Sequence, residues 1–137
     1  LVDFASAFPK LSSEILTEYD SRLDDVPDIF SLMEPMPGAV KAFKELSEKF
    51  DTYILSTSPW ANPSAWSDKL IWVKNYLGPS ANKRLILSHH KNLNAGDFLI
   101  DDRTKNGVNE FKGEHLHFGT PKFPDWNSVV DYLDQKT

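Results

Sequence analysis

Short apolar runs alternate with amphipathic helical patterns along residues 37–137, and this alternation is the strongest constraint on the fold. The runs at 52–55, 84–87 and 98–100 have the length of buried strands, and apolar residues at helical spacing lie before or between them. Strands that follow one another through helical crossovers pair in parallel. The sequence therefore predicts an α/β fold built on a mostly parallel sheet.

The boundaries of the helices can be read from the residues that start and stop them. Pro37 suits a first helical turn, and apolar residues then recur every three or four positions as far as Phe50. A second helix is expected from Ala65 to Leu77, where Gly78 follows, and it should bury some of its apolar residues. The candidates for burial, of which only some need be buried, are Trp66, Leu70, Val73 and Leu77. The remaining expected elements are a short helix at 104–111 weakened by Gly107, an edge strand at 116–118, and a last helix capped by Asp125 that buries Val129, Val130 and Leu133.

Bulk properties limit the class of protein. The 137 residues suffice for one domain with its own core, and no apolar run approaches the roughly 18 residues of a membrane span. A formal net charge of −5 without a Lys/Arg stripe argues against a nucleic-acid polymer as partner, but not against a small phosphorylated ligand. The chain has no cysteine, which excludes disulfides, zinc thiolates and thiol nucleophiles and fits a reducing compartment such as the cytoplasm. Leu1 opens the chain without Met and without a secretory pattern, so we expect an interior piece of a longer protein.

Polar residues follow three of the expected strands, at the sheet edge where ligands bind in open parallel sheets. The first strand leads into Ser56-Thr57-Ser58-Pro59, the second through Ser88 to Lys91, and the third into Asp101-Asp102-Arg103. Hydroxyls and an ammonium group suit phosphate oxygens, and carboxylates suit Mg²⁺. Together these groups are the parts that phosphoryl transfer needs.

Each segment also has a purely structural explanation. Thr-Ser-Pro after a strand is an ordinary turn or helix cap, and Lys91 could be a solvated surface lysine. Asp101 and Asp102 could cap the helix expected near Thr104. Their joint occurrence at successive strand ends is what favours a site.

Histidines and tryptophans give weaker signals. His89 and His90 are adjacent on an extended chain and point to opposite sides, which indicates a solvated loop rather than a metal chelate. His115 and His117 share one face of a strand but lack a third ligand nearby in sequence, so we interpret them as structural. Of the tryptophans, only Trp60, which directly follows the Thr-Ser-Pro turn, is kept as a candidate for substrate binding.

Five segments match a known series of motifs in its order and cover most of the chain. They are 30–39 with Glu-Pro-Met-Pro-Gly-Ala, 53–59 ending in Thr-Ser-Pro, 72–78, 84–91 ending in Lys, and 96–103 with Gly-Asp-Phe-Leu-Ile-Asp-Asp. In these segments the chain resembles the 5'(3')-deoxyribonucleotidases of cytosolic and mitochondrial type, the deoxy-pyrimidine type C 5' nucleotidases, within the haloacid-dehalogenase-like superfamily. The resemblance implies a three-layer Rossmann-like parallel sheet with helices on both faces over 37–137, and a short helical cap segment over 1–36.

The resemblance also implies a Mg²⁺-dependent phosphomonoesterase that dephosphorylates (deoxy)ribonucleoside monophosphates through an aspartyl-phosphate. Thr57 would hold the phosphate with help from Ser58, and Lys91 would neutralise charge on the phosphate and on the attacking carboxylate. Asp102 would bind Mg²⁺, with Asp101 beside it or behind it. Covalent catalysis of this kind divides one hard displacement into two steps.

The chain departs from the family pattern at its beginning. The first motif, Asp-x-Asp-Gly-Val, supplies the nucleophile and the general acid on a strand near the middle of the sheet, and it is expected just upstream of Leu1. Asp3 is no substitute, because it matches a position in the helical segment that follows. The printed chain is therefore expected to be inactive and poorly folded, since the strands beside the gap would expose unpaired edges.

The cap segment is shorter than in the animal enzymes, which leaves the substrate less defined. Phe4 would line the nucleoside pocket, but a phosphatase for another small phosphomonoester stays open, and so does a homodimer. A non-catalytic phosphate-binding or interaction protein is the other alternative, because the nucleophile is missing. A signalling receiver domain is disfavoured, since its acidic pair would precede the Thr and the Lys, whereas Asp101 and Asp102 follow both.

Overall fold

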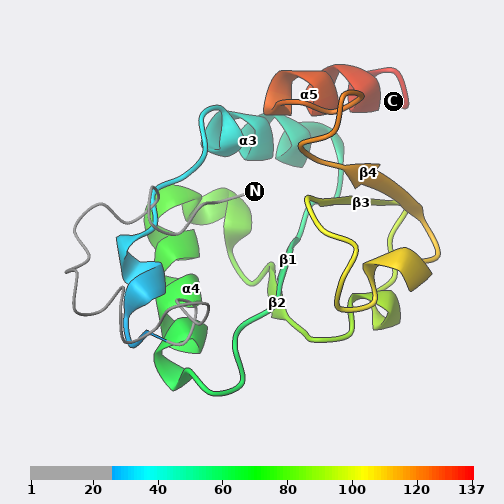
Figure 1. Ribbon diagram of the computed structural model, residues 1–137. Helices are drawn as coiled ribbons and strands as arrows, with labels where there is room; N and C mark the ends of the chain where they lie inside the picture. Colours follow the sequence, from blue (N-terminus) through cyan, green and yellow to red (C-terminus); the bar gives the residue numbers. More distant parts are fainter. Residues whose placement is uncertain (1–25) are drawn as a thin grey trace.

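The computed structural model describes residues 26–137, and Phe4 and most of the expected cap segment lie outside this range. Helices and short strands alternate along the described residues, as the apolar pattern predicts (Figure 1). The elements are η2 (Ile29–Leu32), α3 (Ala39–Lys49), β1 (Ile54–Ser56), α4 (Pro63–Tyr76), η3 (Gly78–Ala81), β2 (Leu85–Leu87), η4 (Lys91–Leu93), β3 (Phe98–Asp101), η5 (Val108–Glu110), β4 (Glu114–His117) and α5 (Trp126–Asp134).

The strands pair in parallel, which confirms the expected crossover topology. β1 pairs with β2 in the register Ile54 to Leu85, and β3 pairs with β4 in the register Asp101 to His117. Within residues 26–137 these are two separate two-stranded sheets rather than the single sheet that the sequence predicts. The described fold is therefore mixed α/β with short parallel strands.

The helices lie where the sequence predicts them, with one exception. The short helix expected at 104–111 is reduced to the 3₁₀ turn η5, because Gly107 has a φ of 83° and interrupts the right-handed backbone immediately before η5. Val73 and Leu77 are buried and Leu70 is 43% exposed, in line with the expectation that only some of the apolar residues at 66–77 are buried. The last helix begins as expected, with the Asp125 side chain accepting a hydrogen bond from the backbone N–H of Ser128.

Helix α3 connects two hydrophobic cores. Its Ala42 and Leu46 pack with α5 and β4 around Leu116, which is fully buried. Its other side contributes Val40 and Phe43 to a smaller core that contains α4 and the strands β1 and β2. Figure 1 shows α3 and α5 side by side at the top of the view, with β3 and β4 below α5 and with α4 below α3 at the left.

A cavity of about 780 Å³ lies between the two sheets. Consecutive residues of both strands line it, at 52–55 and at 94–100. Alternate residues of a strand point to opposite faces, so a cavity that touches consecutive residues borders the edge of each strand. The cavity therefore runs between the edges of β1 and β3 that carry no partner strand within residues 26–137.

Candidate functional site

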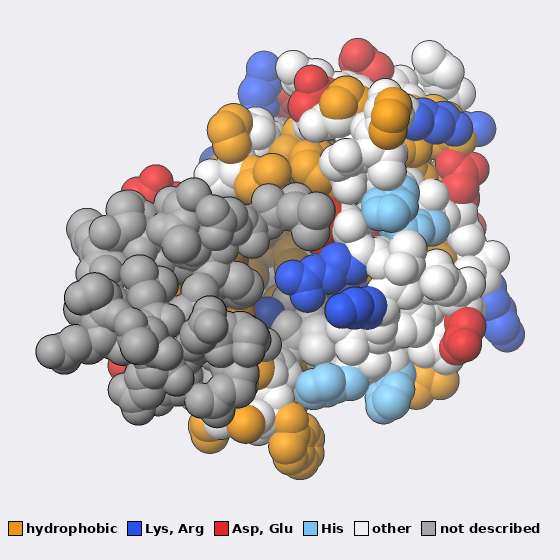
Figure 2. Space-filling model, viewed as in Figure 1, with side chains coloured by type: hydrophobic (Ala, Val, Ile, Leu, Met, Phe, Trp, Pro, Cys, Tyr) orange, Lys and Arg blue, Asp and Glu red, His pale blue; other side chains and the backbone are white. Residues whose placement is uncertain are grey.

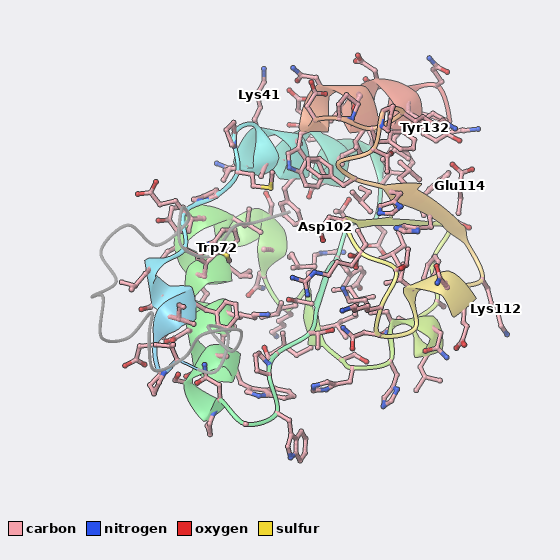
Figure 3. The ribbon with its side chains drawn as sticks, in the orientation of Figure 1. Lys41, Trp72, Asp102, Lys112, Glu114 and Tyr132 are labelled. Atoms are coloured by element: carbon pink, nitrogen blue, oxygen red, sulfur yellow. The ribbon has the colours of Figure 1, made fainter. Side chains whose placement is uncertain are left out.

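The three polar segments of the sequence lie at the carboxyl ends of β1, β2 and β3, as the topology requires. The β1 end carries Thr57 and Ser58, the β2 end carries Ser88, and the β3 end carries Asp101 and Asp102. Figure 3 shows Asp102 at the end of β3. On the face drawn in Figure 2, Lys and Arg side chains lie between two groups of histidine side chains, which makes this side of the molecule locally basic.

The Thr57 hydroxyl joins β1 to β2 beyond the last ladder pair. Its Oγ1 donates a hydrogen bond to the backbone oxygen of Ser88 at 2.8 Å, and Ser88 N donates to Ser56 O at 2.8 Å. The neighbouring Ser58 is fully buried, and its Oγ has no hydrogen-bond partner among residues 26–137. A buried hydroxyl without a partner costs about 1–3 kcal/mol, so this position favours a ligand atom that can accept or donate there.

Lys69 of α4 reaches the end of β1, although the sequence motifs do not predict it as a site residue. Its Nζ donates to Ser56 Oγ at 3.0 Å and also to the backbone oxygen of Thr57. The ammonium group lies 4.5 Å from the centre of the Phe30 ring. A cation therefore lies directly against the Thr57 turn. The signal in the sequence is a lysine four residues after Ala65 and four before Val73, on the buried face of an otherwise apolar stripe.

Lys91 and Asp101 form a buried ion pair at the end of β3. Lys91 Nζ lies 2.5 Å from Asp101 Oδ2, and the two side chains are 11% and 8% exposed. The other carboxylate oxygen, Asp101 Oδ1, accepts the backbone N–H of Arg103 at 2.9 Å. The backbone N–H of Lys91 donates to Asn106 O at 2.7 Å, which ties η4 to the loop after β3.

The Ser88–Lys91 segment links the two clusters. Thr57 contacts Ser88 and Asp101 contacts Lys91, and these two chain positions are three residues apart. Three residues span at most about 11 Å, so the hydroxyl group and the carboxylate are held by opposite ends of one short segment. The structure thus brings Lys91 into contact with Asp101, and it brings Thr57 into contact with Ser88, at the other end of the segment that contains Lys91.

The carboxylates fit a hard divalent cation in number and kind. Among residues 26–137 there is no group of three or more His, Cys, Asp or Glu side chains that could hold a metal ion by themselves. Mg²⁺ in phosphate chemistry is commonly held by one or two carboxylates together with substrate phosphate and waters. Asp101 and Asp102 supply that number of carboxylates, and Asp101 is held in place by Lys91 and by the backbone N–H of Arg103.

An aromatic cluster lies beyond the β1 and β2 ends. The Trp60 ring is T-shaped to Trp66, with centroids 6.4 Å apart, and to His89, with centroids 6.2 Å apart. Trp66 is fixed by its Nε1, which donates to Pro59 O at 3.1 Å, whereas Trp60 is 80% exposed. Trp60 therefore presents a large ring surface to solvent two residues after Ser58.

The described part of the chain contains no helix that is both long and apolar enough to cross a bilayer.

The comparisons with known proteins agree on one family. The family model described as "5' nucleotidase, deoxy (Pyrimidine), cytosolic type C protein" matches residues 14–129. A protein of Vibrio phage KVP40, whose name assigns it to the 5'(3')-deoxyribonucleotidases, is 60% identical over 133 residues, which are 97% of this chain and 78% of the relative.

Two further relatives are more distant. The human 5'(3')-deoxyribonucleotidase of cytosolic type is 34% identical over 114 residues, which are 80% of this chain and 54% of the human protein. A Bordetella pertussis protein, whose name likewise assigns it to the 5'(3')-deoxyribonucleotidases, is 36% identical over 97 residues, which are 69% of this chain and 52% of that protein. The chain thus spans about half the length of these two relatives.

Proposed function

Because this chain belongs to the cytosolic type C family of deoxy (pyrimidine) 5' nucleotidases, we propose that the protein hydrolyses the phosphate ester of (deoxy)ribonucleoside monophosphates. The products are a nucleoside and inorganic phosphate. The observation that carries this proposal is the family match joined to the polar strand ends, with Ser58 and Lys69 at the end of β1 and the Lys91–Asp101 pair at the end of β3. We propose the cytoplasm as its location, in keeping with the absence of cysteine.

The phosphate would bind at the β1 end. Ser58 Oγ is buried without a partner among residues 26–137 and would gain one from a phosphate oxygen. Thr57 would turn its hydroxyl from Ser88 O to the phosphate, exchanging a neutral hydrogen bond for a stronger charge-assisted one. Lys69 and Lys91 would balance the negative charge, the first behind the Thr57 turn and the second from the Asp101 side.

Asp102 would hold Mg²⁺, and Asp101 would either share that role or orient Lys91. When bound, the cation supplies neutralisation of the charge that develops on the transferring phosphoryl group. The ion pair with Lys91 and the Arg103 N–H fix the Asp101 carboxylate in one orientation. We propose that Asp102 binds the cation and that Asp101, held by Lys91 and by the Arg103 N–H, keeps the turn in place.

The nucleophile is expected on a strand just upstream of Leu1. The cavity between β1 and β3 supports this expectation, because one added parallel strand there would join the two described sheets into one, with helices on both faces. A carboxylate at its carboxyl end would attack phosphorus, forming a P–O bond as the ester P–O bond breaks, while a second acid protonates the departing nucleoside hydroxyl. Water would then cleave the acyl phosphate and release inorganic phosphate.

The nucleoside would extend from the phosphate toward aromatic surface. Trp60 offers an exposed ring braced by Trp66 and His89, and a nucleobase can stack on such a face. Phe4, outside the described residues, is the other aromatic side chain proposed for this pocket. A smaller phosphomonoester as substrate, or phosphate binding without catalysis, are the alternatives.

The test is phosphate release by the complete protein, including its upstream segment. Deoxyribonucleoside 5'- and 3'-monophosphates, glycerol phosphate and a metal-free control with EDTA separate the candidates. Mg²⁺-dependent release from a deoxyribonucleotide in preference to glycerol phosphate supports the proposal. Preference for glycerol phosphate would favour the smaller substrate, and saturable nucleotide binding with no release would favour a non-catalytic protein.

Two variants of Thr57 test the phosphate site itself. Thr57→Val removes the hydroxyl at nearly constant volume, and Thr57→Ser keeps it. We expect inhibition by inorganic phosphate to weaken about tenfold or more in Thr57→Val and to be largely retained in Thr57→Ser, in line with one hydrogen bond to a charged group. Equal inhibition of both variants and the wild type would contradict the proposed role of Thr57.

A further inference from the structure

Two stacked histidines of β4 hold the backbone of the two candidate metal ligands. The rings of His115 and His117 lie 5.1 Å apart with an angle of 23° between their planes. His115 Nε2 lies 2.9 Å from the backbone oxygen of Asp101, and His117 Nε2 lies 3.1 Å from the backbone oxygen of Asp102. A carbonyl oxygen only accepts hydrogen bonds, so each histidine donates through an Nε2–H.

The register of the sheet explains how both rings reach the same turn. β3 and β4 are parallel, with Leu99 opposite His115 and Asp101 opposite His117. Residues two apart on a strand share a face, so both rings lie on the face that also carries the Asp101 side chain. The opposite face, with Phe98, Ile100 and Leu116, is packed against the core of α3 and α5.

The His115 ring adds a second hydrogen bond to the carbonyl where the strand ladder ends, and the His117 ring continues the attachment of β3 to β4 one residue further. The last backbone bond between the strands is from Phe118 N to Asp101 O at 3.0 Å. Asp102 lies one residue beyond it, and the His117 ring attaches the Asp102 carbonyl to β4. A side chain of the neighbouring strand therefore sets the position of the Asp102 backbone. This position fixes the point from which the Asp102 carboxylate extends.

We propose that His115 and His117 are positioning residues that orient the Asp101–Asp102 turn for binding a divalent cation. The inference rests on the proposed function, since the cation site is itself proposed, and it assigns the histidines a role other than metal ligation. Outer partners of metal ligands typically contribute tenfold to hundredfold in metal affinity. A purely structural pair would instead change stability without a matching change in affinity for the cation.

The test compares two substitutions of His117 that differ in reach. The amide nitrogen of Gln can occupy the place of Nε2, whereas that of Asn is too short to do so. Asn and Gln are both amides of similar polarity, so an effect on folding alone should appear in both variants. The matched control is His90→Asn, because His90 is exposed on the segment after β2.

The measurement is binding of Mn²⁺ to the complete protein, followed by electron paramagnetic resonance, with the melting temperature recorded in parallel. We expect His117→Asn to weaken Mn²⁺ binding about tenfold or more, and His117→Gln to recover most of the loss. His90→Asn should bind as the wild type does. Unchanged affinity in His117→Asn, or an equal loss in His117→Gln, would overturn the positioning role.

A fourth variant separates this inference from the proposed function. Asp102→Asn removes the candidate ligand itself. If Asp102→Asn loses Mn²⁺ binding while His117→Asn retains it, the cation site stands and only the positioning role fails. If Asp102→Asn binds Mn²⁺ as the wild type does, both the cation site and the positioning role are overturned.

Discussion

Lys91 and Asp101 form an ion pair in which both partners are almost completely removed from solvent. The ammonium nitrogen lies 2.5 Å from the carboxylate oxygen, and the two side chains are 11% and 8% exposed. A charge buried to this extent requires its partner, because desolvation is costly and only the opposite charge and further hydrogen bonds offset it. The pair therefore couples the stability of η4 to the position of the candidate metal ligands.

Breaking this pair from either side should destabilise the protein. We expect Lys91→Met to lower the free energy of unfolding by about 3–5 kcal/mol, since it leaves the Asp101 carboxylate buried without its cation. Urea denaturation measures this loss. The double variant Lys91→Met/Asp101→Leu should recover much of it, because two apolar side chains replace the pair. A loss no larger than that of the exposed Lys112→Met would contradict the prediction.

The Asp102 carboxylate should be needed for activity but not for the fold. We expect Asp102→Asn to abolish Mg²⁺-dependent phosphate release by the complete protein, because an amide oxygen carries no charge to hold the cation. The melting temperature without metal should change little. Asp131→Asn, at an exposed position of α5, removes the same charge elsewhere and should keep full activity. Activity of Asp102→Asn equal to that of the control would exclude Asp102 from the metal site.

Lys69 should affect phosphate binding although the sequence motifs do not include it. Its ammonium group holds the backbone of Thr57 and adds positive charge behind that turn. We expect Lys69→Met to raise the concentration of inorganic phosphate needed for half-maximal inhibition about tenfold, since a hydrogen bond involving a charged group typically contributes about 1.5–3 kcal/mol. Lys74→Met, on an exposed position of the same helix, is the matched control and should leave inhibition unchanged.

The parts of the fold that sequence predicts well depend on local interactions. The α5 start is one example, because Asp125 and Ser128 are three residues apart and the capping bonds form within that span. The parallel pairing also follows from sequence, because helical crossovers between short apolar runs leave few other topologies. The α3 helix likewise lies where its amphipathic spacing predicts.

The parts that sequence does not predict depend on contacts between distant segments. The role of Lys69 requires that α4 lie against the β1 end, a contact across 12 residues that no periodicity specifies. The contact of His117 with Asp102 O requires the register of β4 against β3, 15 residues away. Division into two sheets depends on what occupies the space between β1 and β3. Side-chain partners across a fold are set by packing, and packing is not contained in a local pattern.

A partly buried carboxylate on α4 should make the stability of the fold decrease as the pH rises. Asp68 is partly exposed, but its Oδ2 atom is buried and has no hydrogen-bond partner among residues 26–137. Burial, and secondarily the charge of Asp28, raises the pKa of Asp68 above its ordinary value of 3.8. The folded state therefore holds this proton more tightly than the unfolded chain does. The contribution of Asp68 to stability is fully present below pH 3.8 and is lost as the pH rises through the raised pKa.

Replacing Asp68 by a neutral side chain should remove this dependence. We expect Asp68→Asn to raise the melting temperature at pH 7, where the carboxylate of the unfolded chain is ionised, and to have a smaller effect well below pH 3.8, where the group is protonated in both states. Thermal unfolding at a series of pH values measures the difference between variant and wild type. Asp131→Asn, on the exposed side of α5, is the control, and its melting temperature should differ from that of the wild type by an amount that varies little with pH. A stabilisation by Asp68→Asn that grows as the pH falls would contradict the prediction, since the sign of the linkage would then be that of a carboxylate with a lowered pKa.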